Sequence, residues 1–492
     1  MERSLLAADL RIAGVDYEPL LLAYLLDPTK RDYSIDALAQ EFLDIAVKRG
    51  DQNALIQEEV DPSLDAWLAL CLATDLHDRV RLEDQIDVYS RVELPSSDAL
   101  ALMEFTGVQV NEKMLTELFE QTSNDANQIA QDCYKIIGRE INLSSPKQLQ
   151  TVIFDELGMV GTKSIKTGFS TNAAALAELN EQTPHEFLDK LLAHREATKI
   201  KQMVETLLKS IEADGRIHTS YSQTGTSTGR LSSENPNLQN IPVKSARGRQ
   251  MREAFIYSDG YECLLTADYS QIEMRIMAHL SEDDGLIEAF KTGEDLHRFV
   301  GARIFGVEPA EVTTAMRSKV KAMSYGLVYG LSEYGLAKQL RISNAEAKQL
   351  MSDYFDRFGG VRRYLAQVVD MAKQDGYTVT TFGRRRPFAD LNSKIFQLRE
   401  NARRAALNAP IQGTAADIMK LAMVNVAKAI NEHGMGSRML LQVHDELVFE
   451  VAPGELEQLK QLVTSEMTNV VELSVPLEVH IGVGSNWDEA AH

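Results

Sequence analysis

The stretch that most constrains this chain runs from Leu264 to Arg275 and reads LLTADYSQIEMR. Its apolar start is typical of a short buried strand, yet the run ends on the carboxylate of Asp268 instead of the Gly, Asn or Pro that usually closes a strand. Apolar residues then return at four-residue spacing, at Ile272, Ile276 and Leu280, which predicts a helix that begins almost at once. Asp268 is therefore expected at a strand-to-helix junction, where it either caps the helix or is a rigidly held functional carboxylate.

Length and composition limit the class of protein. A chain of 492 residues is too long for one core, so about three to four domains or subdomains are expected. The 44% hydrophobic and 25% charged content is typical of a globular protein, and the three widely spaced cysteines favour a reducing compartment. The start of the chain lacks a signal-peptide core and no apolar run is long enough to cross a bilayer, so a cytoplasmic protein without membrane contact is expected.

The charge is distributed unevenly. A net charge of −21 argues against a nucleic-acid partner, because phosphate binding needs Lys and Arg. However, residues 1–90 hold 19 acidic and 8 basic side chains, net −11, whereas residues 195–254 hold 10 basic and 6 acidic ones, net +4. Further basic clusters occur at 384–386 and 403–404. The distribution indicates an acidic body with a basic channel, with a solvated charged face as the alternative.

The first segment predicts two helices. One runs from Tyr17 to Leu26 and ends at Asp27 and Pro28, and a second runs from Ile35 to about Leu43. Asp16 and Glu18 have the spacing of a paired-carboxylate metal site, but no partner carboxylates lie at motif spacing nearby, so Asp16 is expected to cap the first helix instead.

Two long helices with polar faces are predicted next, at 113–140 and 186–212, after a long amphipathic pattern from Glu83 to about Val110. The stretch that joins the two helices is rich in Ser, Thr and Lys. Arg195, Lys199 and Lys201 lie near one another on the second helix. They either meet backbone phosphates or form a solvated face.

Polar side chains gather between His218 and Val243, around Arg230. Amide and hydroxyl groups of this kind can donate to groove acceptors without choosing between base pairs, because the minor groove presents a degenerate pattern. A flexible loop would explain the Ser and Gly residues, but less readily the Asn and Gln cluster that Pro242 closes.

A cationic and aromatic face is predicted on a helix from Met316 to Tyr329. Arg317, Lys321, Tyr325 and Tyr329 recur every four residues and so share one broad face. Two cations followed by two aromatic rings suit a triphosphate at one end and a base or sugar at the other. A structural helix with a Tyr stripe toward the core fits the spacing equally well.

The same spacing returns at Arg404, Asn408 and Gln412, where Pro410 is expected to kink or end the helix.

A β-hairpin is predicted from Met439 to Glu450, with a tip that carries His444, Asp445 and Glu446. A simple turn would explain the Asp. It does not explain why an acid pair should be embedded in strands this apolar.

Asp268 and Asp445, taken together, predict a metal site. They are far apart in sequence, but two rigid strand ends can converge at one sheet. Two carboxylates at one site repel unless cations bridge them, and Mg²⁺ is the usual oxygen-ligated ion beside phosphates. Two-metal sites with ions about 3.5–4 Å apart stabilise both the attacking and the leaving oxygen of a phosphoryl displacement, so nucleotidyl transfer is the expected reaction.

At this point the sequence closely resembles the DNA polymerase I family (family A). The three polymerase signatures of the family have counterparts in order, as DYSQIE at 268–273, as Arg317, Lys321, Tyr325 and the YG at 329–330, and as QVHDE at 442–446. The likeness also includes TGRLSS at 228–233 and QGTAAD at 412–417, and covers roughly residues 83–492.

The resemblance implies a right-hand α+β fold with palm, fingers and thumb. The expected divisions are a truncated RNase H-like 3′–5′ exonuclease remnant (1–82), the start of the palm (83–112), the thumb (113–216), the palm (217–275), the fingers (276–420) and the palm again (421–492).

The resemblance also implies an activity: template-directed extension of a primer 3′ end with deoxynucleoside triphosphates (dNTPs), in DNA replication and repair. Asp268 and Asp445 would hold two Mg²⁺ ions, for which Mn²⁺ could substitute, with help from the backbone carbonyl of Tyr269. Glu446 would be a secondary acid.

Contacts to the dNTP follow from the same motifs. Arg317 and Lys321 would neutralise the triphosphate and so be catalytic in effect, with His297 as a further phosphate contact. Tyr325 would stack on the incoming base or sugar, and Glu273 would crowd a ribose 2′-OH. Gln271 completes this set.

Primer-template contacts are expected mostly on the minor-groove side, with Tyr329 guarding the templating position. The remaining residues of this set are Arg230, Asn237, Gln239, Arg404, Asn408, Gln412, His444 and Lys199.

The sequence departs from the family pattern in places. Many members have Phe where Tyr325 stands, which implies weaker discrimination against nucleotides without a 3′-OH. In the first segment the early strand with paired acids is missing, and Cys71 stands four residues before Asp75 where a Tyr is expected. We therefore expect no proofreading. The 5′-nuclease domain of full-length relatives is missing too, so the chain resembles a large fragment.

Particular residues oppose two alternative functions. A single-chain RNA polymerase is opposed by Glu273, and a non-catalytic DNA-binding clamp is opposed by the intact pair of Asp268 and Asp445. The expected partners are primer-template DNA and dNTPs, for a monomer that is cytoplasmic and, in a bacterium, associated with the nucleoid.

Overall fold

The computed structural model describes residues 5–6, 8, 10, 12, 14–47, 62–162, 164–165, 168–243, 245–293, 295–328 and 330–491. It describes the side chains of all of these except residues 165, 296, 303 and 328.

The centre of the molecule is a four-stranded antiparallel sheet with the strand order β11-β12-β8-β13. Its strands are β8 (Cys263–Tyr269), β11 (Arg438–Val443), β12 (Glu446–Val451) and β13 (Val479–Gly484). Side chains alternate between the two faces of a strand. Leu265 and Ala267 of β8 face one hydrophobic core, and Leu264 faces a second one. The sheet is therefore buried on both sides, between two hydrophobic cores.

Helices cover both faces. The first core includes residues of α12 (Ile272–Ser281), α19 (Phe396–Glu432) and α20 (Leu456–Thr468). The second includes residues of α11 (Ala246–Glu253) and α21 (Trp487–Ala490). A three-stranded sheet adjoins it, formed by β1 (Val108–Val110), β4 (Arg216–Ile217) and β7 (Phe255–Ile256).

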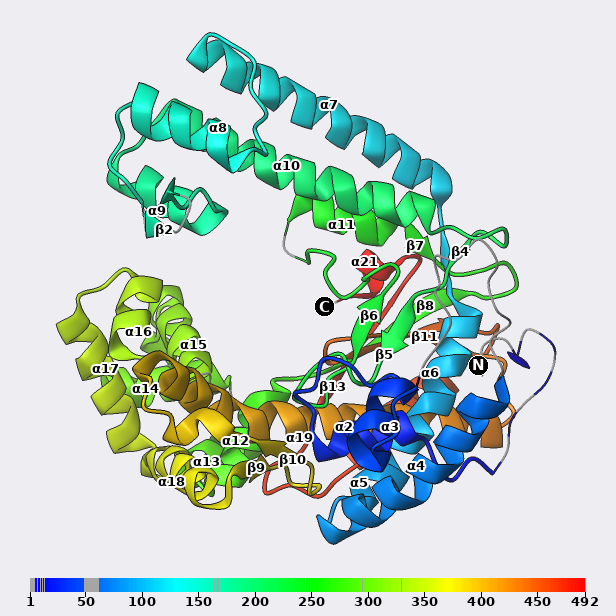
Figure 1. Cartoon of the computed structure of the whole chain (residues 1–492). Helices are drawn as coiled ribbons and strands as arrows, with labels where there is room; N and C mark the ends of the chain where they lie inside the picture. The colour runs from blue at the N-terminus through cyan, green and yellow to red at the C-terminus, as the bar shows by residue number, and fades with distance from the viewer. Residues whose placement is uncertain are drawn as a thin grey trace.

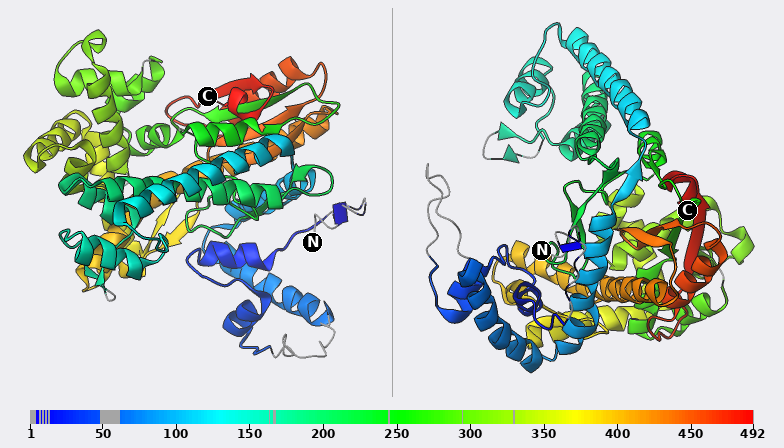
Figure 2. Two further views of the ribbon diagram at one scale, coloured as in Figure 1. Left: turned by 90° about the horizontal axis from the view of Figure 1, so that it is seen from above. Right: turned by 90° about the vertical axis from the view of Figure 1, so that its right-hand side faces the viewer.

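Two long helices, α7 (Glu112–Ile137) and α10 (Glu186–Lys209), extend from this sheet side by side (Figures 1 and 2). They confirm the two helices expected at 113–140 and 186–212. Short elements lie between them in sequence: α8 (Pro146–Gln150), η2 (Thr151–Glu156), β2 (Ser164–Ile165), β3 (Gly168–Phe169) and α9 (Ala173–Gln182).

A second group of helices lies below the tip of this pair in Figure 1. Its members are α13 (Asp284–Lys291), α14 (Leu296–Phe305), η3 (Pro309–Glu311), α15 (Thr314–Val328), α16 (Glu333–Leu340), α17 (Asn344–Arg357) and α18 (Gly359–Asp375). Two exposed ion pairs join α9 to α16 and its end: Lys338 to Glu178 at 3.1 Å and Arg341 to Glu181 at 2.9 Å.

The long helix α19 rules out one of the two expectations for Pro410, that it ends the helix. Pro410 lies inside it, and the helix continues for more than twenty residues beyond the proline, to Glu432. The helix around Pro410 is packed: Leu407, Ala409 and Ile411 are all buried. Tertiary packing thus outweighs the local cost of proline, which removes one helical hydrogen bond. The short elements before α19 are β9 (Tyr377–Val379), β10 (Arg385–Pro387) and η4 (Ala389–Asn392).

Between residues 14 and 106 the described part of the chain consists of helices and the loops that join them, with no strand. Its elements are α2 (Pro19–Leu26), α3 (Ile35–Leu43), α4 (Pro62–Leu82), α5 (Ile86–Val88), η1 (Tyr89–Glu93) and α6 (Leu94–Thr106). In both views of Figure 2 the first three lie on the opposite flank from the C-terminal strand and helix. None of the described helices has the length and apolar content needed to span a membrane.

The cap of α2 differs from the expected one. Helix α2 begins at Pro19, not Tyr17, and its N-cap is Glu18, whose carboxylate accepts from the backbone N–H of Leu20 at 3.3 Å. Asp16 is not the cap; its carbonyl accepts from the hydroxyl of Tyr89 at 3.1 Å. The proline shifts the start, because it favours the first helical position and leaves Glu18 just before it. Helix α3 has the expected bounds.

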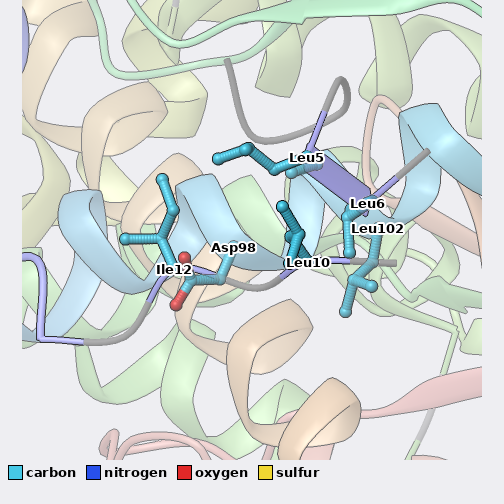
Figure 3. Close-up of a pocket in the computed structure, with 7 residues that line it drawn as sticks. Leu5, Leu6, Leu10, Ile12, Asp98 and Leu102 are labelled. Carbon is cyan, nitrogen blue, oxygen red and sulfur yellow. The ribbon is translucent and has the colours of Figure 1, made fainter. Parts of the chain in front are cut away.

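A small apolar pocket lies where residues near the N-terminus meet α6 (Figure 3). The segment near the N-terminus contributes Leu5, Leu6, Leu10 and Ile12 to its lining, and α6 contributes Asp98, Ala101 and Leu102. It shares none of the residues singled out from the sequence.

A buried ionic cluster connects the N-terminal helices to α19. Glu93 pairs with Arg384 and, at 2.7 Å, with Lys420, and Arg384 pairs with Asp417 at 2.7 Å. All four side chains are at most 5% exposed. Burial alone would raise the pKa of Glu93, but the charges of Lys420 and Arg384 outweigh it and lower the pKa to about 2. Glu93 is therefore ionised and anchors two cations.

Replacement of Glu93 by glutamine is expected to destabilise the protein by about 3–5 kcal/mol, because it leaves a buried cation without its counter-charge. Urea unfolding measures the shift. Asp75→Asn is the control, since Asp75 pairs with Arg79 on the surface of α4 and such pairs contribute about 0–1 kcal/mol. Equal shifts for the two variants would contradict this account.

Candidate active site

The strand-to-helix junction expected at Asp268 is present. Strand β8 ends at Tyr269, and α12 begins at Ile272. The N-cap of α12 is Gln271, in the left-handed region with φ 52°. Asp268 is therefore not a helix cap, and the alternative interpretation, a functional carboxylate on a rigid strand, remains.

Asp268 lies on the face of β8 that it shares with Leu264, since alternate residues point to one side. Directly opposite on β12 is Glu446, which pairs with Asp268 in the register of the sheet. His480 of β13 lies opposite on the other side. The carboxylates of Asp268 and Glu446 thus project from neighbouring strands onto one face of the sheet.

The predicted hairpin is also present. Strands β11 and β12 are joined by a two-residue turn, His444 and Asp445. His444 has φ 55°, a value that His tolerates better than most residues. The backbone N–H of Tyr269 donates to the carbonyl of Asp445 at 3.1 Å. This bond ties the hairpin tip to the end of β8, so the two aspartates predicted from distant motifs are brought together.

The pKa values of Asp268 and Asp445 are both raised, so the cations near these carboxylates do not compensate for their burial. Burial raises the pKa of Asp268 to about 7, and the charges of Glu446 and Asp445 add to the rise, against the effect of Arg252. Burial also raises the pKa of Asp445, while the charge of Arg230 opposes it. Such a site gains most from a bound cation.

Glu446 is held differently from the two aspartates. The indole N–H of Trp487 donates to it at 2.8 Å, and Arg252 lies 3.7 Å away. The guanidinium of Arg252 stacks 4.3 Å from the ring centre of Trp487. Sequence reasoning missed Arg252 and Trp487, because their spacing to the acid motifs carries no signal.

Glu273 and Arg230 form a second part of the site. Glu273 is only 6% exposed, and Arg230 donates to its carboxylate at 2.6 Å. Arg230 also lines a pocket with His444 and Asp445. The pocket further includes Gln239 and Gln442, whose side chains bond to each other at 3.2 Å.

The cationic face of α15 is formed as expected. Arg317 is exposed and donates to Asp295 at 2.8 Å, and Lys321 is exposed one turn further on. Asp295 also caps α14, which brings in His297. Burial lowers the pKa of His297 to about 4, and the cations Lys321 and Arg317 add to the effect against Asp295.

Tyr325 links the cations to the carboxylates. It is half-buried, and its ring centre lies 6.1 Å from that of His297. Burial raises the pKa of Tyr325, and the charges of Glu273, Asp445 and Asp268 add to the rise. Tyr325 therefore faces both groups. Tyr329, the next residue of the predicted stripe, lies outside the described residues.

Two buried polar atoms in this region have no hydrogen-bond partner among the described residues: Nδ1 of His297 and Oε1 of Gln271. Buried polar groups are normally satisfied, so unpaired ones call for an explanation such as a missing ligand. Oδ1 of Asn408 is in the same state.

The other residues expected to contact DNA come from separate elements, among them Lys199 on α10 and Arg404 on α19. Asn237, Lys199, His444 and Arg404 are exposed, and Gln412 is half-buried. Asn237 accepts from the N–H of Asn240 at 3.1 Å, and Arg404 donates to Asn401 at 2.7 Å.

Lys199 stands apart from its two neighbours on α10. Arg195 donates to the carbonyl of Thr171 at 2.5 Å, and Lys201 lies 5.7 Å from the ring centre of Phe119. Both of these cations therefore make contacts within the protein.

The oxygen donors of the site fit a magnesium ion that is bound partly by the protein and partly by substrate phosphates. Within the described ranges, no group of three or more His, Cys, Asp or Glu side chains is placed to hold a metal. Mg²⁺ usually takes one or two carboxylates and completes its shell with substrate phosphates and water. Asp268 and Asp445 provide such a pair, and the backbone carbonyl of Tyr269 is a further oxygen.

Known proteins resemble this chain over most of its length. The family model "DNA polymerase family A" matches residues 112–489. DNA polymerase I of Mycobacterium bovis is 52% identical over 98% of this chain and 54% of the relative. DNA polymerase I of Geobacillus stearothermophilus is 40% identical over 98% of this chain and 56% of the relative. The chain thus spans about half the length of these relatives.

A solved structure gives the same result for the fold. The POL domain of Pol1 from M. smegmatis, in complex with DNA primer-template and dNTP, superimposes with a TM-score of 0.93 and 53% identity, covering 99% of this chain and 85% of that one. Family A polymerases are metal-dependent enzymes, which agrees with the carboxylate pair. Motifs, fold and comparisons together place this chain in DNA polymerase family A.

Proposed function

We propose that this chain is a template-directed DNA polymerase that extends a primer 3′ end with dNTPs by two-metal-ion nucleotidyl transfer, in DNA replication and repair. The observation that carries the proposal is the meeting of Asp268 and Asp445 at one end of a buried sheet, tied by the bond from the Tyr269 N–H to the Asp445 carbonyl. The similar M. smegmatis POL domain, which was solved in complex with DNA primer-template and dNTP, supports the same substrates.

Asp268 and Asp445 would hold two Mg²⁺ ions, or Mn²⁺ in their place, with the Tyr269 carbonyl as a further ligand. When bound, two such ions stabilise both the attacking and the leaving oxygen. The strand and hairpin keep these donors fixed before substrate arrives, so little reorganisation is needed during the reaction. Glu446 would be a secondary acid; its hydrogen bond from Trp487 and its ion pair with Arg252 orient it beside Asp268.

The face formed by α14 and α15 would bind the dNTP. Arg317 and Lys321 would neutralise the triphosphate, and neutral His297 would use its unpaired Nδ1 or its other ring nitrogen as a further phosphate contact. Tyr325 would stack on the incoming base or sugar, between the phosphates and the carboxylates. Gln271, with its unpaired amide oxygen, would complete the pocket.

The DNA would lie across the sheet under the pair α7 and α10. This pair belongs to the proposed thumb (113–216), the helices α13–α18 to the proposed fingers (276–420), and the sheet to the palm (217–275 and 421–492, preceded by 83–112). The proposed primer-template contacts are Arg230, Asn237, Gln239, Arg404, Asn408, Gln412, His444, Tyr329 and Lys199.

The same proposal includes a monomer without proofreading that works in the cytoplasm on nucleoid DNA. Residues 1–82 would be the remnant of a 3′–5′ exonuclease. Two acids that stand near the positions of the family's exonuclease motifs make other contacts: Glu18 caps α2, and Asp75 pairs with Arg79. Templated addition of a single complementary dNTP to a primer tests the proposed polymerase activity, and failure of wild-type protein to add any nucleotide would refute it.

Glu273 is expected to select the sugar. Glu273→Ala should reduce the preference for dNTPs over ribonucleotides by roughly 10- to 200-fold, the range for one side-chain group in a substrate pocket. The ratio of kcat/KM values for dATP and ATP opposite template dT measures it. Glu457→Ala, a remote glutamate on the exposed face of α20, is the matched control. An unchanged ratio in Glu273→Ala would remove Glu273 from the sugar-binding site.

A further inference from the structure

A buried tyrosine of the N-terminal helices reaches the loop that carries Arg230. Tyr24 of α2 is fully buried. Its hydroxyl donates to the carbonyl of Thr226 at 2.7 Å and accepts from the backbone N–H of Gly229 at 3.0 Å. One side chain thus bridges two backbone groups of the loop 226–230, from a position about two hundred residues earlier in the sequence.

The loop is tied a second time at the same place. The hydroxyl of Thr226 donates to the carbonyl of Arg230 at 2.7 Å. Together with Tyr24 it satisfies polar groups at both ends of the loop. Buried backbone groups that lack such partners are rare because they are costly. The loop therefore has one well-determined conformation.

The loop is also packed closely on its far side. Gly229 has φ +88°, and a Cβ there would lie 2.9 Å from Nε of Arg384. Arg384 is itself fixed by the buried carboxylates of Glu93 and Asp417. Gln223 adds a further tie, since its amide donates to the carbonyl and to the carboxylate of Glu93, each at 2.8 Å. The segment 223–230 is held between the N-terminal helices and α19.

Arg230 follows directly on this fixed backbone. Its guanidinium donates to Glu273 at 2.6 Å and lines the pocket that also contains Asp445. A functional side chain is held more precisely at its target when the backbone that carries it is fixed by surrounding contacts. Two hydroxyls hold this backbone and so determine where the guanidinium lies: that of Thr226 bonds the carbonyl of Arg230 itself, and that of Tyr24 bonds the carbonyl of Thr226 and the N–H of Gly229.

We propose that Tyr24 is a positioning residue for nucleotidyl transfer, which acts through the loop 226–230 to hold Arg230 against Glu273 beside Asp445. The helices before residue 107 would then be a working part of the polymerase site, although the matched family model begins at residue 112. The inference rests on the proposed function, because it assumes that Arg230 and Glu273 face the substrate.

Tyr24→Phe tests the inference, because it keeps the ring and removes only the hydroxyl. Single-nucleotide addition should show kcat/KM for the dNTP reduced roughly 10- to 100-fold, the loss that a displacement of about 1 Å causes in a reacting geometry. The dNTP-to-ribonucleotide ratio should fall as well, since the partner of Glu273 has moved.

The matched control is Tyr33→Phe. Tyr33 packs edge-on against Tyr24 at 6.0 Å between ring centres, and its hydroxyl donates to the carbonyl of Asp27 at 2.7 Å, away from the loop. Both variants should lower the thermal midpoint to a similar degree, but only Tyr24→Phe should change the sugar selectivity. If the two variants have the same kinetics, Tyr24 is merely structural and the inference fails.

A double-mutant cycle tests the route through Arg230. In an Arg230→Ala background, Tyr24→Phe should have no further effect on kcat/KM, because the group that it positions is gone. A further loss as large as in wild type would overturn the inference. Should Tyr24→Phe not fold, Thr226→Val removes the second tie of the loop and makes the same prediction. Lack of activity in wild type would refute the proposed function itself, and this inference with it, whereas an active wild type with a silent Tyr24→Phe refutes this inference alone.

Discussion

Asp445→Asn is expected to lower the rate of single-nucleotide addition by about 10³-fold or more, and Asp268→Asn by a similar factor, because each removes one of two charges that would hold the metal ions. Asparagine keeps the size and the hydrogen-bonding shape of the side chain, so the sheet and the hairpin should remain intact. Single-turnover extension of a labelled primer at saturating Mg²⁺ measures the rate.

The control for both variants is Asp259→Asn, an exposed aspartate a few residues before β8. It should have the wild-type rate. DNA affinity, measured by fluorescence anisotropy, should stay within about threefold of wild type in all three variants, since loss of an anionic group does not weaken attraction to phosphates. Wild-type extension by either Asp268→Asn or Asp445→Asn would remove that residue from the metal site.

The second large effect is expected at Lys321. Lys321→Ala should reduce kcat/KM for the dNTP by roughly 10²- to 10³-fold, the loss that follows removal of one preorganised charge from a transition state. Arg317 is already paired with Asp295, whereas no carboxylate lies within 4 Å of Lys321 among the described residues. A triphosphate can therefore bind Lys321 without displacing a carboxylate from it.

Lys319→Ala is the matched control, because Lys319 lies two positions before Lys321 on α15 and so on a different face of the helix. It should differ little from wild type. Equal losses in Lys319→Ala and Lys321→Ala would indicate that general positive charge on the helix, not a specific contact, supports catalysis.

Where a local pattern was strong, the sequence alone was enough to predict the structure. The run 264–275 predicted a strand and a helix, and the apolar halves around His444 and Asp445 predicted a hairpin; both are present. These segments are determined by side-chain periodicity within about ten residues, which a sequence displays directly. The proximity of Asp268 and Asp445 followed only when both were assigned to strand ends of one sheet.

Local rules failed where neighbouring residues or packing decided the outcome. Asp268 and Asp16 both looked like helix caps, yet the helices begin after Gln271 and Glu18. Gln271 takes the N-cap position in a left-handed backbone conformation, with φ 52°, which residues other than Gly, Asn and Asp seldom adopt. Backbone strain therefore lies beside the candidate site. Pro410 does not end α19, because the helix around it is packed into buried cores.

Long-range polar contacts were beyond the reach of the sequence. Tyr24 and Gly229 are separated by 205 positions, and Glu93 and Arg384 by 291. Arg252, which lies 3.7 Å from Glu446, belongs to the basic stretch 195–254, from which the sequence predicted a basic channel or a solvated face but no contact with an acid of the site. Contacts of this kind depend on how whole elements pack, so only the folded structure shows them.

The central claim is tested most directly by primer extension on a defined template, with each dNTP offered singly, with Mg²⁺ or with excess chelator, and with a matched or mismatched labelled 3′ end. We predict addition of only the complementary dNTP, strict dependence on the divalent ion, and no removal of the mismatched 3′ nucleotide. Addition that ignores the template base, or that continues at full rate in excess chelator, would contradict a template-directed two-metal polymerase built on Asp268 and Asp445.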